Sequence, residues 1–226
     1  KILIIKKCIK RYAKNILVMT KKTNNQKSTQ KISYFVLDKF DVKEVVEIHN
    51  CELKISVLTL FGSAFLRRMY LVLLKEENWG FVAKLEGNIV GFIFATKPKT
   101  SFFKCLSIID VFFFLINSIR NPIKFIFFLH VLKEFYMGIL KNRTFQEESL
   151  IELFNFAIKK DYKSRGIGSE LIKKFEFKAK ECGFSHVLTR THNEKLSHYY
   201  IKNKKATAIK KIKSVIQGSI ILKWKI

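Results

Sequence analysis

The chain has 226 residues, of which 43 are Lys or Arg and 18 are Asp or Glu, so its formal charge is +25. With 48% apolar residues but only 9 Gly and 2 Pro, the composition excludes a disordered tail and a collagen-like or low-complexity chain. The length fits one sizeable domain with an appendage.

The first 31 residues are strongly basic, with ten Lys or Arg and no acidic residue. Within residues 1–18 the apolar side chains recur at the spacing of one helix face, at Ile2, Ile5, Ile9, Tyr12 and Ile16. This pattern is typical of a basic helix that lies on a membrane surface. Alternatively, the native protein begins at Met19. In either case residues 20–31 are predicted to be a solvated linker.

Residues 32–96 alternate between strand and helix patterns. We predict a strand at 32–37, helices at 41–51 and 60–74, and strands at 79–85 and 89–96. Glu86-Gly87-Asn88 joins the last two strands, and Gly and Asn tolerate the positive φ of a tight turn. The last two strands are therefore predicted to form a β-hairpin.

Residues 102–140 are very apolar. A membrane span needs about 20 nearly uncharged residues, but Asp110, Arg120, Lys124 and Lys133 divide this stretch into shorter runs. Asn121-Pro122 indicates a helix end and restart. We predict two amphipathic helices that pack on the domain, on a second copy of the chain or on a membrane surface.

The remaining chain returns to alternating strands and helices. We predict strands at 150–158, 186–190, 206–212 and 219–226, and helices at 166–181 and 193–202, with Gly183 as the C-terminal cap of the first. This order predicts a mixed α/β sheet with helices on both faces. Cys8, Cys51, Cys105 and Cys182 form no C-x-x-C pair, and the five His are scattered. We therefore predict a reducing, cytoplasmic location without disulfides or a metal site.

The strand at 150–158 runs into a turn with two glycines, Gly166 and Gly168, and a helix begins at once. Glycines let the backbone approach an anion, and a helix N-terminus contributes N–H groups and partial positive charge. Lys163 and Arg165 add full charges. The spacing matches neither the P-loop of nucleoside triphosphatases nor the longer dinucleotide fingerprint.

Lys163-Ser164-Arg165-Gly166-Ile167-Gly168 resembles the [Q/R]-x-x-G-x-[G/A] signature of the GCN5-related N-acetyltransferase (GNAT) superfamily. Asn193-Glu194-Lys195-Leu196-Ser197-His198-Tyr199-Tyr200 is similar to the family's N-x-x-A-x-x-[F/Y]-Y segment. The resemblance covers residues 32–226. It implies an α/β fold with a mixed, splayed central sheet flanked by helices. Residues 102–140 would be an apolar helical insert between the third and fourth strands, and residues 1–31 a basic N-terminal extension.

The resemblance implies acetyl-CoA as cosubstrate. The pantetheine arm would pair with Phe156, Ala157 and Ile158, and Asn193 would bond the arm or hold the splayed strand. Tyr200 would protonate the leaving thiolate, with Tyr199 as its competitor. Glu152 resembles the family's general base, with Glu147 and Glu148 as alternatives, and strict alternation puts it on the face of Phe154 and Phe156, opposite Asn155. The diphosphate would lie on the loop residues Lys163, Ser164, Arg165, Gly166, Ile167, Gly168 and Ser169.

Three departures from the family pattern stand out. Lys163 replaces the usual Arg or Gln, Lys159-Lys160 replaces an acidic-Pro step, and Lys204-Lys205 replaces the Gly-Phe after the tyrosine helix. The first two are expected to tune cofactor affinity, because Lys keeps the charge of Arg but lacks its planar fork. The third leaves the docking of the final hairpin open.

The function that the resemblance implies is transfer of an acetyl group from acetyl-CoA to a primary amine of a small acceptor, such as an amino sugar or glycoconjugate precursor, by direct attack of the amine. The alternative is a non-catalytic basic module that binds an anionic membrane or nucleic acid. Nucleic acid is not expected as a partner, because the chain has no recognisable reading motif. Peripheral contact with the inner membrane face through residues 1–18 or 102–140, and a homodimer, stay open.

Overall fold

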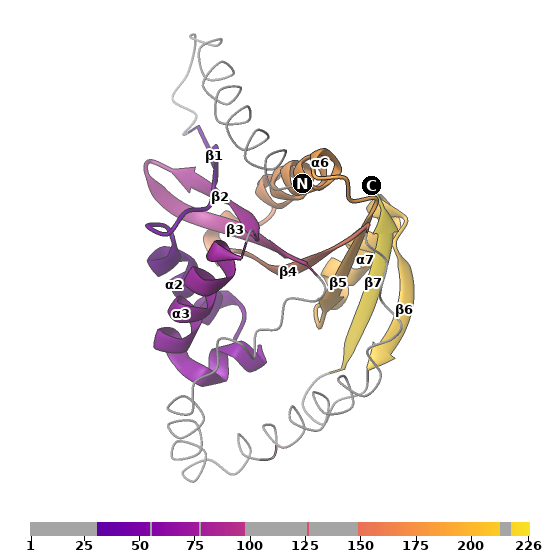
Figure 1. Ribbon diagram of the computed structural model, residues 1–226, viewed down its shortest axis with the longest axis horizontal. Coiled ribbons are helices and arrows are strands. Elements are labelled where there is room, and N and C mark those ends of the chain that lie inside the picture. The colour runs from indigo at the N-terminus through magenta and orange to yellow at the C-terminus, as the bar shows by residue number, and fades with distance from the viewer. Residues whose placement is uncertain (1–30, 55, 77, 98–125, 127–148, 213–217) are drawn as a thin grey trace.

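A computed structural model describes residues 31–54, 56–76, 78–97, 126, 149–212 and 218–226. Within these residues, seven strands form one sheet in the order β1-β2-β3-β4-β5-β7-β6 (Figure 1). The strands are β1 (Ser33–Val36), β2 (Trp79–Leu85), β3 (Asn88–Thr96), β4 (Leu150–Ile158), β5 (His186–Thr191), β6 (Thr207–Ile212) and β7 (Ser219–Lys225). The helices are α2 (Val42–Glu52), α3 (Gly62–Lys75), α6 (Ile167–Glu181) and α7 (Glu194–Lys204), with 3₁₀ turns η1 (Val57–Phe61) and η3 (Lys160–Tyr162).

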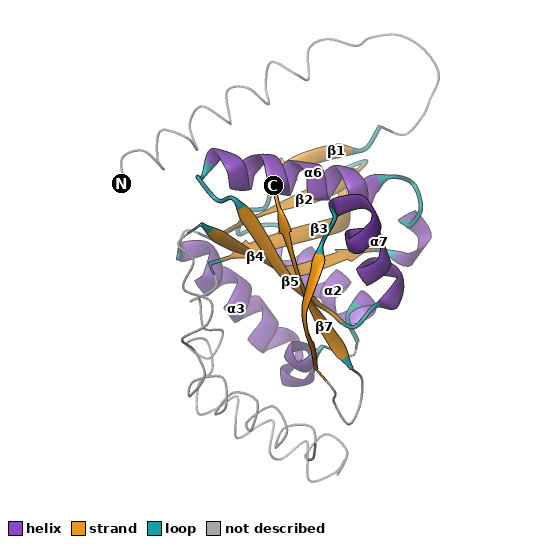
Figure 2. Ribbon diagram, turned by 90° about the vertical axis from the view of Figure 1, so that its right-hand side faces the viewer, coloured by secondary structure: helices purple, strands orange, loops and turns teal. Residues whose placement is uncertain are grey.

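The helices cover both faces of the sheet, as the sequence predicted. Figure 2 shows α6 and α7 on one face and α2 and α3 on the other. Phe175 of α6 and Tyr200 of α7 belong to the core on the first face, whereas Phe65 and Tyr70 of α3 belong to the core on the second. Each face of β2, β3 and β4 is therefore covered by a separate apolar layer.

The observed helices and strands begin and end within a few residues of the predicted bounds. Glu86 and Gly87, with φ of 50° and 84°, form the turn between β2 and β3, as a two-residue hairpin requires. Gly183 has φ 84°, its N–H bonds Lys180 O, and Phe184 N–H bonds Ala179 O. This pair of bonds is a Schellman motif, which confirms Gly183 as the terminator of α6.

The predicted helix at 1–18 and the predicted insert at 102–140 lie outside the described residues, apart from Ile126. In the described part of the chain, no helix is both long and apolar enough to cross a membrane.

The parallel strands β4 and β5 pair only at their beginnings. Their register runs from Leu150↔His186 to Leu153↔Thr189. Beyond that point Figure 1 shows the two strands diverging. Residues 155–158 of β4 pair with β3 on one side, and no described strand pairs with their other edge. The sheet is therefore splayed, as the resemblance of the sequence motifs implied.

A β-bulge in β4 changes which side chains share a face. Asn155 opposes Phe94 of β3 and Leu153 opposes Ala95, so Phe154 is an extra residue without a partner in this ladder. Leu153 and Phe156 consequently both lie on the α6 face. The expectation that Glu152 shares a face with Phe156 and opposes Asn155 is therefore wrong. Strict alternation fails where the extra residue is inserted.

The junction between α7 and the final hairpin departs from the family pattern at Lys204-Lys205. Lys205 takes the left-handed conformation with φ 51°, a position that favours glycine. The following residue, Ala206, is buried, and its N–H bonds Tyr200 O at 3.2 Å. β6 and β7 then pair, and β7 pairs with β5, so the hairpin docks without the Gly-Phe step.

We expect Lys205→Gly to stabilise the protein by about 0.5–1 kcal/mol. Left-handed backbone costs a side chain about 1–2 kcal/mol, and the greater freedom of glycine in the unfolded chain returns about 0.4–1 kcal/mol. In a chain of this size the melting temperature should rise by about 2 °C in thermal unfolding. The control Lys202→Gly, inside α7, should lower it. A Lys205→Gly melting temperature at or below that of the wild type would contradict this account.

Candidate active site

The loop between β4 and α6 has the geometry of an anion-binding site. Ser164 and Gly166 both have positive φ, 62° and 78°, which turns the chain sharply into the helix. No side chain caps the N-terminus of α6, so the N–H groups of its first turn receive no side-chain acceptor. Residues 163–166 are exposed. These features fit a diphosphate, whose charge a helix N-terminus favours.

Gly168 lets the first turn of α6 approach β4 closely. A Cβ at this position would lie 3.0 Å from Ile158 Cδ1 and 3.1 Å from Phe156 Cζ. The two glycines therefore do different work. Gly166 permits the left-handed turn with open space around it, and Gly168 permits the contact between helix and strand.

Helix α2 contacts this loop through Glu52. Its carboxylate accepts the Lys160 N–H at 2.8 Å and forms an ion pair with Lys163. Burial opposes ionisation of Glu52, but the hydrogen bonds and charges of Lys163 and Lys160 outweigh it and lower its pKa. Lys163, a predicted diphosphate ligand, is therefore already held by a carboxylate. An incoming diphosphate would share this lysine with Glu52.

The predicted pantetheine segment, Phe156–Ile158, lies on the open edge of β4. Its amides follow the last β4–β5 pair, Leu153↔Thr189. Phe156 and Ile158 pack on the α6 face, and Ala157 is buried on the other face. An extended ligand could add a strand here, because the backbone edge is not used by β5.

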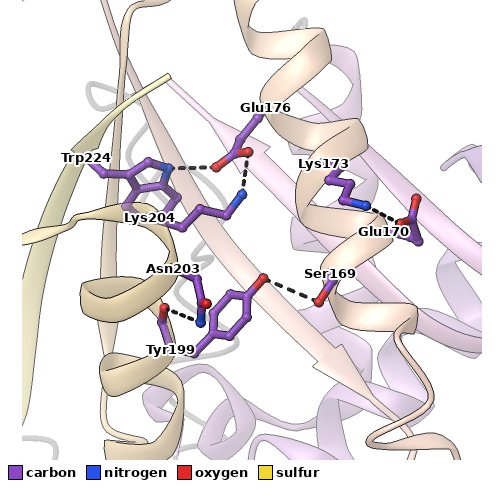
Figure 3. A network of polar contacts seen from close by, with 8 residues as sticks. All are labelled: Ser169, Glu170, Lys173, Glu176, Tyr199, Asn203, Lys204 and Trp224. Carbon is purple, nitrogen blue, oxygen red and sulfur yellow. Dashed lines mark hydrogen bonds and ion pairs between the residues drawn. The ribbon is translucent and has the colours of Figure 1, made fainter.

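Figure 3 shows how α6, α7 and β7 are held together next to this edge. Glu176 of α6 accepts a hydrogen bond from Trp224 Nε1 at 2.9 Å and pairs with Lys204 at 2.7 Å. Nearer the loop, the Tyr199 hydroxyl donates to Ser169 Oγ at 3.4 Å. Asn193 caps α7, since its Oδ1 accepts the Leu196 N–H at 3.1 Å.

The two adjacent tyrosines of α7 have different environments. Tyr200 is fully buried, and its ring stacks on Trp224 with centroids 5.0 Å apart. Its hydroxyl has no hydrogen-bond partner among the described residues. Burial, with the nearby charges of Tyr199 and Glu176, raises the pKa of Tyr200 above its ordinary value. Tyr200 therefore stays protonated at neutral pH.

Glu152 lies beside the point where the strands diverge. It opposes Thr96 of β3 and Leu188 of β5, on the face away from the α6 core. Its side chain keeps some solvent access, yet desolvation raises its pKa to about 7, against an opposing effect of Arg190. A carboxyl that ionises near neutral pH is suited to accept a proton. The alternatives Glu147 and Glu148 lie outside the described residues.

A buried polar chain on the α3 side was not anticipated from the sequence. Asn155 Nδ2 donates to the Tyr70 hydroxyl at 3.0 Å, and this hydroxyl in turn donates to His49 Nδ1 at 2.9 Å. Burial lowers the pKa of His49 to about 4, so the ring is neutral and can accept. The chain ties the bulged segment of β4 to α2 and α3. No local signal reveals it, because its members lie 21 and 85 residues apart.

The profile of the acetyltransferase (GNAT) family matches residues 42–203. An N-acetyltransferase from Staphylococcus aureus Mu50 has 10% identity and a TM-score of 0.55, covering 86% of this chain and 98% of its own. The yncA protein of Salmonella typhimurium, solved with acetyl-CoA, has 9% identity and a TM-score of 0.54, covering 86% of this chain and 94% of its own. The paia N-acetyltransferase of Thermoplasma acidophilum, solved with coenzyme A, has 14% identity and a TM-score of 0.52, covering 87% of this chain and 99% of its own. No curated protein sequence matches the chain.

Proposed function

Because this chain belongs to the GNAT family of acetyltransferases, and is thus an acyl-CoA-dependent N-acetyltransferase, we propose that it acetylates a primary amine of a small acceptor, such as an amino sugar. The observation that carries the proposal is the open edge of β4 followed by the uncapped N-terminus of α6, which together would form one donor site. Two structures with the same fold contain acetyl-CoA or coenzyme A, which supports acetyl-CoA as the donor.

Acetyl-CoA supplies an activated acyl group, and the residues of this chain would bind and orient it. The N–H groups from Lys163 to Ser169 would hold the diphosphate, with the charges of Lys163 and Arg165. The backbone of Phe156–Ile158 would align the pantetheine arm. A backbone N–H on this strand is suited to stabilise negative charge on the thioester oxygen. Asn193 already caps α7 through Oδ1, which leaves its Nδ2 donors for the arm.

Glu152 would be the general base. A neutral amine must attack the thioester, so a proton has to leave the acceptor nitrogen during the reaction. The carboxylate of Glu152 can take it directly or through water, since its pKa of about 7 matches the working pH.

Tyr200 would donate a proton to the leaving thiolate. Its buried hydroxyl has no hydrogen-bond partner in the described part of the chain, and a ligand atom is the kind of partner expected for such a group. Tyr199 is the alternative donor, but its hydroxyl already donates to Ser169.

Two measurements test the proposal. Calorimetry should detect binding of acetyl-CoA with a dissociation constant in the micromolar range. A thiol-release assay over amino sugars, amino acids and polyamines should identify acceptors that accelerate CoA formation. Absence of binding and of thiol release with every amine would reject the acetyltransferase function in favour of a non-catalytic basic module.

Tyr200→Phe is expected to lower kcat about tenfold and to change the KM for acetyl-CoA much less. The loss is moderate because a thiol, with an ordinary pKa near 8.5, is a good leaving group even without an acid. Thermal unfolding should show equal or greater stability, since a buried hydroxyl without a partner is removed. Tyr199→Phe is the matched control and should leave kcat nearly unchanged. An unchanged kcat in Tyr200→Phe would remove Tyr200 as the acid.

A further inference from the structure

The face of the sheet around Glu152 carries a hydroxyl and a cation that the donor site does not use. Thr96 of β3 and Leu188 of β5 are the direct neighbours of Glu152. Because side chains alternate along a strand, Arg190 lies on the same face as Leu188, one step further toward the divergence. This face is opposite the α6 core, which contains Ile151, Leu153 and Val187.

Thr96 is the first of these groups. Its side chain is only 2% exposed, and Oγ1 has no hydrogen-bond partner among the described residues. Directly opposite residues on paired strands have Cβ atoms about 4.5–5.5 Å apart, so Oγ1 is within reach of a small group bound at Glu152. A buried hydroxyl without a partner among the described residues costs stability, and a ligand atom is one partner that would offset this cost.

Arg190 is the second group. Its Nε donates to Ser219 Oγ at 2.9 Å, which fixes the guanidinium at the edge where β4 and β5 diverge. Its charge is close enough to act on the ionisation of Glu152. Lys223 of β7 opposes Leu188 and adds a second cation to this face. The acceptor side of the sheet is therefore positively charged next to the proposed base.

We propose that the acceptor is a primary amine that also carries an anionic group, with its nitrogen held by Glu152 and Thr96 and its anion bound by Arg190. The proposal rests on the proposed function and narrows its substrate class. The nitrogen forms the new bond to the acyl carbon while the bond from carbon to sulfur breaks. One proton passes from the nitrogen to Glu152, and the sulfur takes one from Tyr200. The proton that Glu152 gains equals the one that Tyr200 gives up, so the reaction has no net proton change and both side chains return to their starting states.

The charge at Arg190 has two consequences for the acceptor. It attracts a carboxylate or phosphate, for which a guanidinium provides several donors. It also disfavours the ammonium form of the nearby amine, and so favours the neutral form that can attack. A polyamine, which carries further cations and no anion, should be a poor acceptor.

The test compares matched amines that differ by one anionic group. Glucosamine 6-phosphate is measured against glucosamine, and β-alanine against propylamine, in the thiol-release assay. We expect kcat/KM at least about tenfold higher for the anionic member of the preferred pair, mainly through KM. The pair with the larger difference in kcat/KM shows whether the site prefers a phosphate or a carboxylate. Equal or better turnover of both neutral amines would overturn this inference but leave the acetyltransferase function intact.

Substitutions on the Glu152 face of the sheet then test which residue causes the preference for an anionic acceptor. Arg190→Gln should remove the advantage of the anionic acceptor, whereas Arg190→Lys should keep part of it, and neither should alter the KM for acetyl-CoA. Lys225→Gln removes the same charge from β7 at the level of His186, about 13 Å along the strand, and should keep the advantage. Thr96→Val, which lacks the hydroxyl, should raise the KM for the acceptor. Thr96→Ser, which keeps it, should have a KM near that of the wild type. An advantage that survives Arg190→Gln would refute Arg190 as the anion site.

Discussion

Glu152→Gln is expected to lower kcat/KM for the acceptor by about 10²–10⁴-fold, the range typical of a lost general base. The wild-type rate should rise with pH up to about 7, because burial raises the pKa of Glu152 to about 7 and only the carboxylate accepts a proton. Glutamine keeps the size of the side chain but cannot accept the proton. The rise in rate with pH should therefore disappear in the variant.

The same substitution separates catalysis from stability. Because the folded pKa lies above the ordinary value of 4.5, ionisation of Glu152 costs folding free energy, and wild-type stability declines as pH rises from about 4.5 to 7. Glu152→Gln lacks this decline and should be at least as stable as the wild type at pH 8. Glu47→Gln on the exposed side of α2 is the matched control. A variant with wild-type rate and pH profile would exclude Glu152 as the base.

Features encoded by neighbouring residues could be predicted from the sequence. The turn at Glu86-Gly87 and the Schellman motif at Gly183 both depend on a glycine with positive φ, which residue type alone indicates. The strand, glycine loop and helix from Leu150 to Glu181 follow each other directly in the chain. For this reason the sequence alone predicts the loop that we propose as part of the donor site.

Features that depend on the register between distant segments could not be predicted. The bulge at Phe154 exists only relative to β3, and it reverses the faces of Asn155 and Phe156. Glu52 reaches Lys163 across 111 residues, and Thr96 meets Glu152 across the whole segment 98–148, almost all of it outside the described residues. Strand pairing decides each contact, and no periodicity in one segment records the register of another.

The packing of α6 on β4 gives the second large effect. In Gly168→Val, the first added carbon alone would lie about 3 Å from the Ile158 and Phe156 side chains, and two further methyl groups follow. Overpacking of this kind costs about 1–3 kcal/mol. Relief requires the N-terminus of α6 to move away from β4, which would separate the proposed diphosphate site from the open strand edge. Because each 1.4 kcal/mol is tenfold in affinity, calorimetry should show CoA binding about 10- to 100-fold weaker.

A second glycine serves as the control for whether the close approach of α6 to β4 at Gly168 is needed for CoA binding. At Gly218, before β7, the described residues give a Cβ one neighbour, Ile212 O at 3.5 Å, which is an ordinary contact, so Gly218→Val should bind CoA as the wild type does. Gly168→Ala should be intermediate, because the neighbouring atoms are the far ends of side chains that can shift. Pantetheine lacks the diphosphate and depends on the strand edge alone, so Gly168→Val should weaken its binding less than that of CoA. Equal loss for both ligands would mean that the substitution disrupts β4 itself, and no loss for either would place the diphosphate elsewhere.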